Sequence, residues 1–468
     1  MKPIYLAKIV ACSAFTVGSG LQLSAQKLEP RPNIILIITD QQSARAMSNR
    51  IGRQYLKTPN MDYLANHGIT FTSAYCANPL CIPSRSSMFT GLYPHQVGIQ
   101  ANENDKDLGN VGFQMMGNIF QKGGYETAYF GKWHLPYDLK NKNSHGFEWL
   151  AHNKSNGIDS LIPADAIGFL HQKHEKPFLM VASFIDPHNI CEWARGQKLP
   201  DGEVGIPPGA EACPPLPANH APGKNESDIV TLLRRSAQAS PMFPVGNFDD
   251  TKWRQYLWAY YRMIEKVDGQ IGKILEDLRK TGIDKNTVIV FLADHGDSQG
   301  AHSLNQKTNF FEEAVNVPFI ITLPGMLKPE ISTKLIQTGI DLIPTLCDYA
   351  GIPVPPELPG LSARKLATEK SVSSRGFVVS SVKPIQGSPV NGVKPDPDGR
   401  MVRGYRYKYW IYSQGTQRES LFDLKNDSGE MTNLATNPEY KAILMEYRKD
   451  LADWCEKYKD SFSQYLIK

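Results

Sequence analysis

Cysteine is scarce in this chain, which has seven among 468 residues. Cys12 falls in the N-terminal leader described below, and the other six are irregularly spaced. They are too sparse to form a disulfide scaffold, and no C-x-x-C pair indicates a zinc finger or ribbon. At least one cysteine therefore needs an explanation of its own.

Strong net charge and long apolar runs are also lacking. The formal net charge is +4, and Lys2 and Lys8 of the leader contribute part of it. A mature chain so near neutrality lacks the basic balance of a nucleic-acid-binding protein, so no nucleic-acid partner is expected. No segment after the leader reaches the roughly 18 uninterrupted apolar residues of a membrane-spanning helix, so no membrane span is expected.

The first 25 residues have the features of a secretory signal. Early lysines accompany a short apolar run over residues 9–17, and small residues end the segment at Ser24 and Ala25. This pattern predicts a signal peptide over residues 1–25 and a secreted or periplasmic protein. The stretch "IVAC", which ends at Cys12, loosely matches a bacterial lipobox and leaves lipid attachment as an alternative.

Apolar runs separated by helix-like stretches predict an α/β fold. The runs show no alternation of apolar and polar residues, which indicates strands covered on both faces, as in a parallel sheet. They begin at Asn33, Thr127, Phe178, Thr287 and Val317. In such sheets ligands bind beyond the carboxyl ends of the strands, so a functional site is expected there.

The remaining segments predict the domain organisation. Apolar residues at helical spacing predict a long helix over 253–278, and the Pro-rich segment 351–360 is typical of a linker. Beyond the linker, a hairpin is expected within 401–424, followed by a terminal helix. We therefore expect a large catalytic domain over 26–360 and a small C-terminal α+β subdomain with an antiparallel sheet over 361–468.

Polar side chains follow two of the predicted strands. Asp40 and Gln41 follow the first, and Asp294 and His295 follow the fourth. Two carboxylates and an amide oxygen at the ends of neighbouring strands would form a hard-cation site. Either aspartate alone could instead cap a helix, but their paired occurrence favours metal binding.

Basic and imidazole side chains follow other predicted strands. Lys132 and His134 come after the second strand, His188 after the third and Lys307 after the fourth. Taken singly, such residues are usually solvated or structural. Together beside a metal they would form a pocket for a tetrahedral oxyanion.

The segment "CIPSRSSMFTG", from Cys81 to Gly91, resembles the sulfatase signature. In that signature Cys is followed by x-Pro-Ser-Arg and, after four further residues, by Thr-Gly, and all these residues are present here. "GKWH", "DPHN" and "ADHGD" also occur in the order typical of type I sulfatases. The similarity extends over nearly the whole mature chain and implies a fold like that of alkaline phosphatase, with a small C-terminal subdomain.

The resemblance implies that a separate maturation enzyme converts Cys81 to formylglycine. The hydrated aldehyde has two hydroxyls: one attacks the sulfur of a sulfate ester and releases the alcohol, and the other then expels sulfate. A plain cysteine or serine lacks the second hydroxyl. A disulfide between Cys76 and Cys81 would disable such an enzyme, so Cys76 is expected to be a packing residue.

The resemblance also implies a role for each polar residue. Four residues would bind one divalent cation, expected to be Ca²⁺: Asp40, Gln41, Asp294 and His295. Arg85 and Lys132 would neutralise charge around the nucleophile, and His134 would assist turnover of the hydrate. His188 and Lys307 would bind the sulfate, and His188 would protonate the leaving oxygen.

The expected metal ligands depart from the usual family pattern. Many members have Asp-Asp and then Asp-Asn, whereas this chain has Asp40-Gln41 and Asp294-His295. The site is therefore less anionic and less purely oxygen-based, which leaves the identity of the metal open. Asp297 is a nearby substitute ligand.

The combination of "ITDQQ", "GKWHLP" and "DPHNICEWAR" is similar to bacterial uronate-2-O-sulfatases. Those enzymes act on unsaturated disaccharides that lyases release from heparan sulfate or chondroitin sulfate. Such a substrate carries a carboxylate as well as a sulfate, and Lys106 is a candidate to bind the carboxylate, with a solvated lysine as the alternative.

Other functions stay open at this point. They are a sulfatase for another sugar position, and a phosphodiesterase or phosphonate hydrolase of the same superfamily. A non-catalytic glycan-binding protein is disfavoured, because Cys81, Arg85, His134, His188 and Lys307 are all retained.

Overall fold

The computed structural model describes residues 31–102, 112–154, 157–368 and 374–467. These residues belong to one compact unit that begins at Arg31. The predicted signal peptide, Cys12 and Lys106 lie outside the described residues. No helix within the described ranges combines the length and the hydrophobicity that a bilayer crossing requires.

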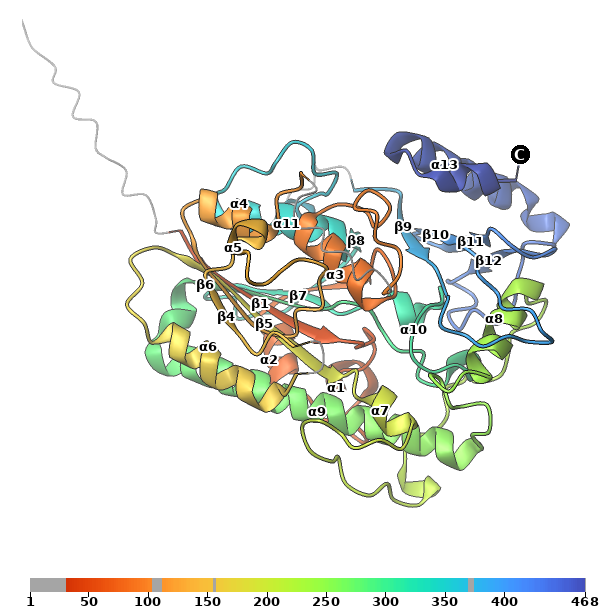
Figure 1. Cartoon of the computed structure of the whole chain (residues 1–468), viewed down its shortest axis with the longest axis horizontal. Helices are drawn as coiled ribbons and strands as arrows, with labels where there is room; N and C mark the ends of the chain where they lie inside the picture. The colour runs from red at the N-terminus through yellow and green to blue at the C-terminus, as the bar shows by residue number, and fades with distance from the viewer. Residues whose placement is uncertain (1–30, 103–111, 155–156, 369–373, 468) are drawn as a thin grey trace, which may run out of the picture. The chain divides into compact units, whose positions relative to one another are not determined.

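An eight-stranded sheet lies at the centre of this unit (Figure 1), in the order β4-β3-β5-β1-β6-β7-β2-β8. Its strands are β1 (Asn33–Asp40), β2 (Gly68–Tyr75), β3 (Glu126–Gly131), β4 (Trp149–Ala151), β5 (Phe178–Pro187), β6 (Thr287–Ala293), β7 (Phe319–Thr322) and β8 (Glu330–Gln337). All strands except β7 run parallel, as the pairing of β1 with β5 and β6, of β3 with β4 and β5, and of β2 with β8 shows. The predicted α/β fold with a mostly parallel sheet is confirmed.

Strand β7 is the exception to the predicted parallel arrangement, because it pairs antiparallel with both β6 and β2. Between β6 and β7 the chain forms only short helices and loops, so no long helix carries it back to the opposite edge of the sheet. It re-enters the sheet from the edge where β6 ends. The apolar run at Val317 could not reveal this, because a strand covered on both faces has the same composition in either direction.

Helices cover both faces of the large sheet (Figure 1). One face packs on α2 (Pro59–Asn66), α6 (Ile162–Leu170) and α9 (Asp250–Thr281), and the other on α3 (Cys81–Thr90), α4 (Met116–Lys122), α11 (Thr338–Ala350) and α12 (Ala363–Thr368). Along β1, Ile35 and Ile37 point into the first layer, whereas Leu36 and Ile38 point into the second. Two buried faces explain the unbroken apolar run. The long helix predicted over 253–278 lies within α9.

The structure describes six further α-helices. They are α1 (Ser48–Ile51), α5 (Lys142–His145), α7 (Ile190–Ala194), α8 (Asp228–Gln238), α10 (Glu312–Val315) and α13 (Lys441–Tyr458). Short 3-10 helices lie at Asp159–Leu161, Ala210–Ala212, Ile283–Asn286, Ala301–Ser303, Pro438–Tyr440 and Ser461–Tyr465.

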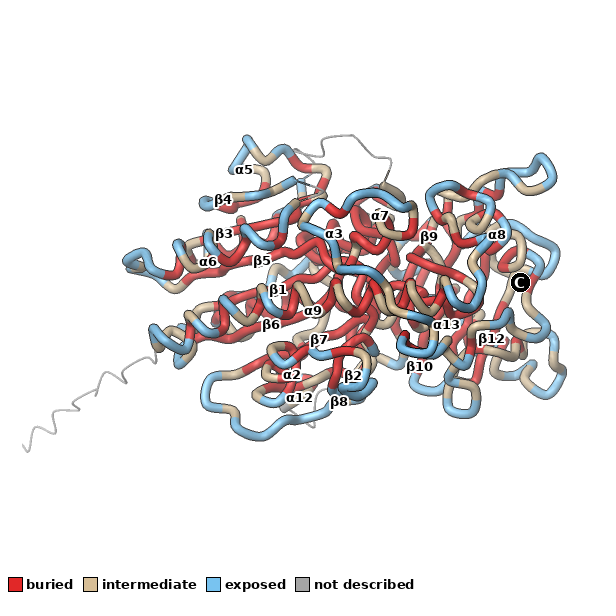
Figure 2. Tube along the Cα trace, turned by 90° about the horizontal axis from the view of Figure 1, so that it is seen from below, coloured by how far each residue is buried: buried red, intermediate tan, exposed pale blue. Residues whose placement is uncertain are grey.

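A second, antiparallel sheet contains β9 (Phe377–Val382), β10 (Gly399–Gly404), β11 (Tyr407–Tyr412) and β12 (Glu419–Asp423), in the order β12-β11-β10-β9. Tyr409 and Ile411 face α13, whereas Trp410 and Tyr412 face a cluster that includes Tyr75 of the large sheet. Both faces are therefore buried (Figure 2). The expected hairpin and terminal helix are present, and α12 packs with the helices of the large sheet.

Candidate active site

The carboxyl ends of β3, β5, β1 and β6 meet at one edge of the large sheet, because these strands are adjacent and parallel. Asp40 ends β1, and Asp294 directly follows β6. Lys132 follows β3, and His188 follows β5. The parallel topology thus brings together polar residues that are far apart in the sequence.

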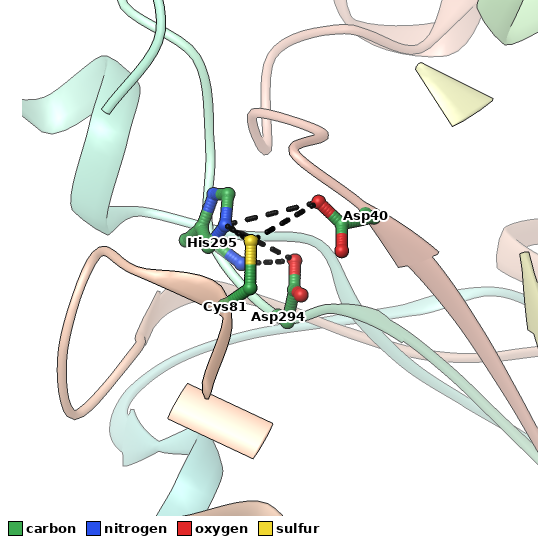
Figure 3. Close-up of side chains that lie close together, drawn as sticks. All are labelled: Asp40, Cys81, Asp294 and His295. Carbon is green, nitrogen blue, oxygen red and sulfur yellow. Dashed lines mark hydrogen bonds and ion pairs between the residues drawn. The ribbon is translucent and has the colours of Figure 1, made fainter. Parts of the chain in front are cut away.

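Cys81 faces this edge from the first position of α3. Its Sγ lies 3.2 Å from Nε2 of His295 and 3.8 Å from Oδ1 of Asp40 (Figure 3). Lys307 Nζ donates a hydrogen bond to the sulfur at 3.2 Å. Cys81 is completely buried, so its sulfur lies inside the polar cluster rather than on the surface.

Arg85, one turn further along α3, fixes both aspartates. Its Nε donates to Oδ2 of Asp294 at 2.8 Å, and its second terminal nitrogen donates to Oδ2 of Asp40 at 3.1 Å. Lys132 Nζ also lies 2.6 Å from Oδ2 of Asp40. Oδ2 of both carboxylates is therefore occupied. Oδ1 of Asp294 accepts the backbone N–H groups of Gln41 and His295 at 3.1 and 2.9 Å, whereas Oδ1 of Asp40 faces Cys81 and His295.

One ligand atom from each of Asp40, Cys81, Asp294 and His295 lies within 4.8 Å of the others. The Nδ1 of His295 lies 3.0 Å from the carbonyl oxygen of Gly296. With Nδ1 donating to that carbonyl, the Nε2 lone pair is free to bind a cation, as in most metal-binding histidines. The donor set fits a divalent cation, so this is a candidate metal site.

The electrostatics of the aspartates also fit a cation. Burial and the Asp40 carboxylate raise the pKa of Asp294 to about 6. Burial opposes the ionisation of Asp40 too, but Lys132 and other positive groups outweigh it and hold its pKa well below the usual value. A bound cation would reduce the repulsion between the two buried carboxylates and would favour their ionised forms.

The surroundings of Cys81 favour an anion at its side-chain position. Burial and Asp40 oppose ionisation of the thiol, but Lys307, Lys132 and His295 outweigh them and hold its pKa well below the usual value. An oxyanion at this position would be stabilised in the same way.

His134 and His188 form the open side of the site. Both interact electrostatically with Cys81, and both are partly exposed, unlike the buried groups around them. Burial, Lys307 and Lys132 lower the pKa of His188 to about 3. Nδ1 of each ring has no hydrogen-bond partner among the described residues. These two rings are therefore the more exposed members of the cluster around Cys81.

Gln41 and Asp297, the other expected ligands, are joined by hydrogen bonds to each other and to Lys307. The amide oxygen of Gln41 accepts a hydrogen bond from Lys307 Nζ at 2.7 Å, and its Nε2 donates to Oδ2 of Asp297 at 2.7 Å. Asp297 also accepts hydrogen bonds from Tyr256 and from the backbone of Gln299. Gln41 thus links Lys307, which contacts Cys81, to Asp297.

Cys76 and Cys81 are not linked, since all the cysteines of the described residues are free. Cys76 packs in an apolar cluster beside β2, where burial raises the pKa of its thiol. This agrees with the expected packing role.

The sequence analysis missed two buried polar residues near the site. Ser183 of β5 accepts a hydrogen bond from Arg85 at 2.9 Å. Asp159 accepts the backbone N–H groups of Ile185 and Asp186, at 2.7 and 2.8 Å, in the strand end that leads to His188. A serine inside the apolar run "FLMVASFI" was an available signal for Ser183, whereas nothing local distinguishes Asp159.

Comparisons with known proteins identify the family. Residues 32–352 match the family model described as "Sulfatase", and residues 300–457 match "N-sulphoglucosamine sulphohydrolase, C-terminal". The chain belongs to the sulfatase family. This sulfatase is 33% identical over 474 residues to a Δ4,5-hexuronate-2-O-sulfatase of Bacteroides thetaiotaomicron, with 96% of the chain and 94% of the relative covered.

Solved structures give the same result. The sulfatase superposes on a structure described as a 2-O GAG sulfatase with a TM-score of 0.80 and 32% identity, over 94% of each chain. It also superposes on the phosphonate monoester hydrolase of Agrobacterium radiobacter with a TM-score of 0.70, over 92% of this chain and 96% of that one. The identity to that hydrolase is 22%, so this likeness shows a shared fold alone.

Proposed function

We propose that this sulfatase hydrolyses the 2-O-sulfate ester of a terminal unsaturated hexuronate in disaccharides from heparan sulfate or chondroitin sulfate. The observation that carries the proposal is the likeness to a Δ4,5-hexuronate-2-O-sulfatase over nearly the full length of both chains. The convergence of Arg85, His188 and Lys307 around Cys81 and Asp40 supports it, since this arrangement is suited to a sulfate ester.

Two groups would complete the site. A formylglycine made from Cys81 by a maturation enzyme would supply the nucleophilic oxygen. A divalent cation, proposed to be Ca²⁺ and held by Asp40, Gln41, Asp294 and His295, would polarise the sulfate. The buried sulfur position among cationic groups supports the first, and the cluster of donor atoms supports the second.

The chain's own residues would then act on the ester. Arg85 and Lys132, which also contact the aspartates, would neutralise charge around residue 81, and Lys307 and His188 would bind the sulfate. His134 assists turnover at residue 81. His188, on the open side, would pass a proton to the leaving sugar oxygen.

The predicted leader supports export of the enzyme to the periplasm or beyond the cell, where such disaccharides are released. Lys106 stays a proposed ligand for the uronate carboxylate, since it lies outside the described residues.

A panel of sulfated disaccharides tests the proposal. The matured enzyme, with conversion of Cys81 verified by peptide mass, is incubated with disaccharides that carry sulfate at uronate O2, hexosamine O6 or hexosamine N. We expect sulfate release from uronate O2 alone, and none by a Cys81→Ala variant with an unchanged melting temperature.

Two results would contradict the proposal. Preferential release from a hexosamine position would assign the enzyme to another sugar position. Faster hydrolysis of a phosphodiester or phosphonate monoester than of every sulfated sugar would assign it to the hydrolases that share its fold.

A further inference from the structure

The donor atoms at the active site are unusual for a calcium site while residue 81 is still cysteine. The cluster combines one sulfur, one imidazole nitrogen and two carboxylate oxygens. Calcium prefers six to eight oxygen ligands, whereas four ligands that include thiolate and imidazole are typical of zinc. The unconverted chain therefore presents a different metal site from the mature enzyme.

The distances between the donor atoms fit a single tetrahedral ion. In a zinc shell with Zn–S of about 2.3 Å and Zn–N or Zn–O of about 2.0–2.2 Å, neighbouring ligand atoms are roughly 3.3–3.6 Å apart. Cys81 Sγ lies 3.2 Å from His295 Nε2 and 3.8 Å from Asp40 Oδ1. His295 Nε2 lies 3.8 Å from Asp40 Oδ1 and 3.7 Å from Asp294 Oδ1. The remaining two separations are within 4.8 Å.

The surrounding groups hold these donors in the orientation that a metal needs. Arg85 binds Oδ2 of both aspartates, and the backbone N–H groups of Gln41 and His295 bind Oδ1 of Asp294, so both carboxylates are held in fixed orientations. The Gly296 carbonyl fixes the His295 ring with Nε2 toward the cluster. Such outer contacts orient ligands in established zinc sites. All four side chains are completely buried, so little ordering is required on binding.

The net charge of the site favours cation binding more strongly when residue 81 is cysteine than after its conversion. Arg85, Lys132 and Lys307 bring three positive charges to the site, against two from Asp40 and Asp294. A Cys81 thiolate adds a third negative charge, whereas an aldehyde or its hydrate is neutral. The thiolate has further lone pairs, so Lys307 can keep its hydrogen bond to the sulfur beside a metal.

We propose that the unconverted chain binds one zinc ion through Cys81, His295, Asp40 and Asp294, and that conversion of Cys81 opens this closed site. Binding forms a Zn–S bond and releases the thiol proton to solvent, with no change in oxidation state. Four protein ligands leave no position for a substrate oxygen, as in structural zinc sites. Loss of the sulfur ligand frees one position. This second step rests on the proposed conversion.

The test uses the full chain produced without the maturation enzyme, with the thiol verified by mass. The metal-free protein receives one equivalent of Zn²⁺, and bound zinc is measured after gel filtration with a weak chelator. We expect one zinc per chain. Substitution by Co²⁺ should produce a sulfur-to-cobalt charge-transfer band, which reports ligation directly.

Matched variants separate Cys81 from the other thiols. Cys81→Ser keeps the size of the side chain but removes the soft donor, and we expect zinc binding at least about 100-fold weaker and no charge-transfer band. Cys191→Ser removes a buried thiol that contacts Gln41 outside the cluster, and both readouts should be unchanged.

Absence of zinc from the folded Cys81 chain, or binding that survives Cys81→Ser, would overturn the proposal. Neither result bears on the substrate, because sulfate release is measured on converted enzyme. Conversely, a converted enzyme that is inactive on sulfated uronates leaves the zinc measurement intact.

Discussion

His188, like His134, is partly exposed beside Cys81, and its pKa is lowered. Burial and two neighbouring lysines lower its pKa to about 3, so the imidazole carries no extra proton at neutral pH when no substrate is bound. The negative charge of a sulfate ester beside the ring would raise this pKa. Such a shift is what the proposed role of His188 as proton donor requires.

A change at this residue should depend on the leaving group. In His188→Ala, we expect kcat for a uronate 2-O-sulfate to fall by about 10²- to 10⁴-fold, the usual contribution of a general acid. An aryl sulfate with an acidic phenol leaves without protonation, so its kcat should fall much less. Steady-state kinetics on both substrates measure the difference.

His174→Ala is the matched control, because this histidine pairs with Glu126 near the start of β3, at the other end of the strand from Lys132. Equal losses on the two substrates in His188→Ala would argue against proton donation by this residue.

At the scale of elements, a single carboxylate shapes the end of β5. Asp159 lies in a 3-10 helix outside the sheet and is only 2% exposed. Its carboxylate accepts hydrogen bonds from the backbone N–H groups of Ile185 and Asp186 in β5. The N–H of His188 in turn donates to the Ile185 carbonyl at 2.9 Å. Asp159 thus acts on His188 through the backbone and is a positioning residue.

Removal of one acceptor from this contact should misplace His188. In Asp159→Asn, we expect kcat on the sugar sulfate to fall about 10- to 100-fold, because a shift of roughly 1 Å has that effect on catalysis. The aryl sulfate should again be less affected, and KM should change little.

The control is Asp165→Asn. Asp165 lies on α6, is partly exposed and pairs with His152, so both rates should be unchanged. An Asp159→Asn enzyme with normal kcat on the sugar sulfate would show that this contact is purely structural.

The same elements show what the sequence could and could not predict. Polar residues after apolar strands predicted that Asp40, Lys132, His188 and Asp294 lie close together, and the structure brings them together because parallel strands have their carboxyl ends at one edge. The direction of β7 and the partners of Asp159 depend on contacts between distant segments. Composition records that a residue is buried and not what it contacts, so the engagement of Gln41 with Lys307 was equally unpredictable.

For the molecule as a whole, one buried ion pair fastens α13 to the small sheet. Asp460, just after α13, accepts hydrogen bonds from Nε of Arg400 on β10 at 2.7 Å and from a terminal nitrogen at 3.0 Å. Burial opposes ionisation of Asp460, but Arg400 and His95 outweigh it and hold its pKa below the usual 3.8. Ionised Asp460 therefore stabilises the folded state.

Loss of this charge should destabilise the protein in a pH-dependent way. In Asp460→Asn, we expect the free energy of unfolding at pH 7 to fall by about 3 kcal/mol, since Arg400 stays buried without its partner. The lowered pKa means that this stability is present above pH 3.8 and is lost as the pH falls through the folded-state value. The difference in the free energy of unfolding between wild type and Asp460→Asn should therefore become smaller only below about pH 4.

Urea unfolding across this pH range measures the effect. Asp453→Asn, in the exposed pair with Lys449, is the control and should cost at most about 1 kcal/mol at any pH. A pH-independent loss in Asp460→Asn would assign the effect to packing rather than charge.

The sequence separation within the active site also has a consequence in time. Cys81 and Lys307, whose side chains are in contact, are 226 positions apart. At a synthesis rate of about 5–20 residues per second, roughly 10–45 s pass between the emergence of the two residues from the ribosome. The Cys81 sulfur is completely buried in the folded protein. During that interval the residues that surround it are not yet all synthesised, so the sulfur is accessible to a maturation enzyme or a metal ion.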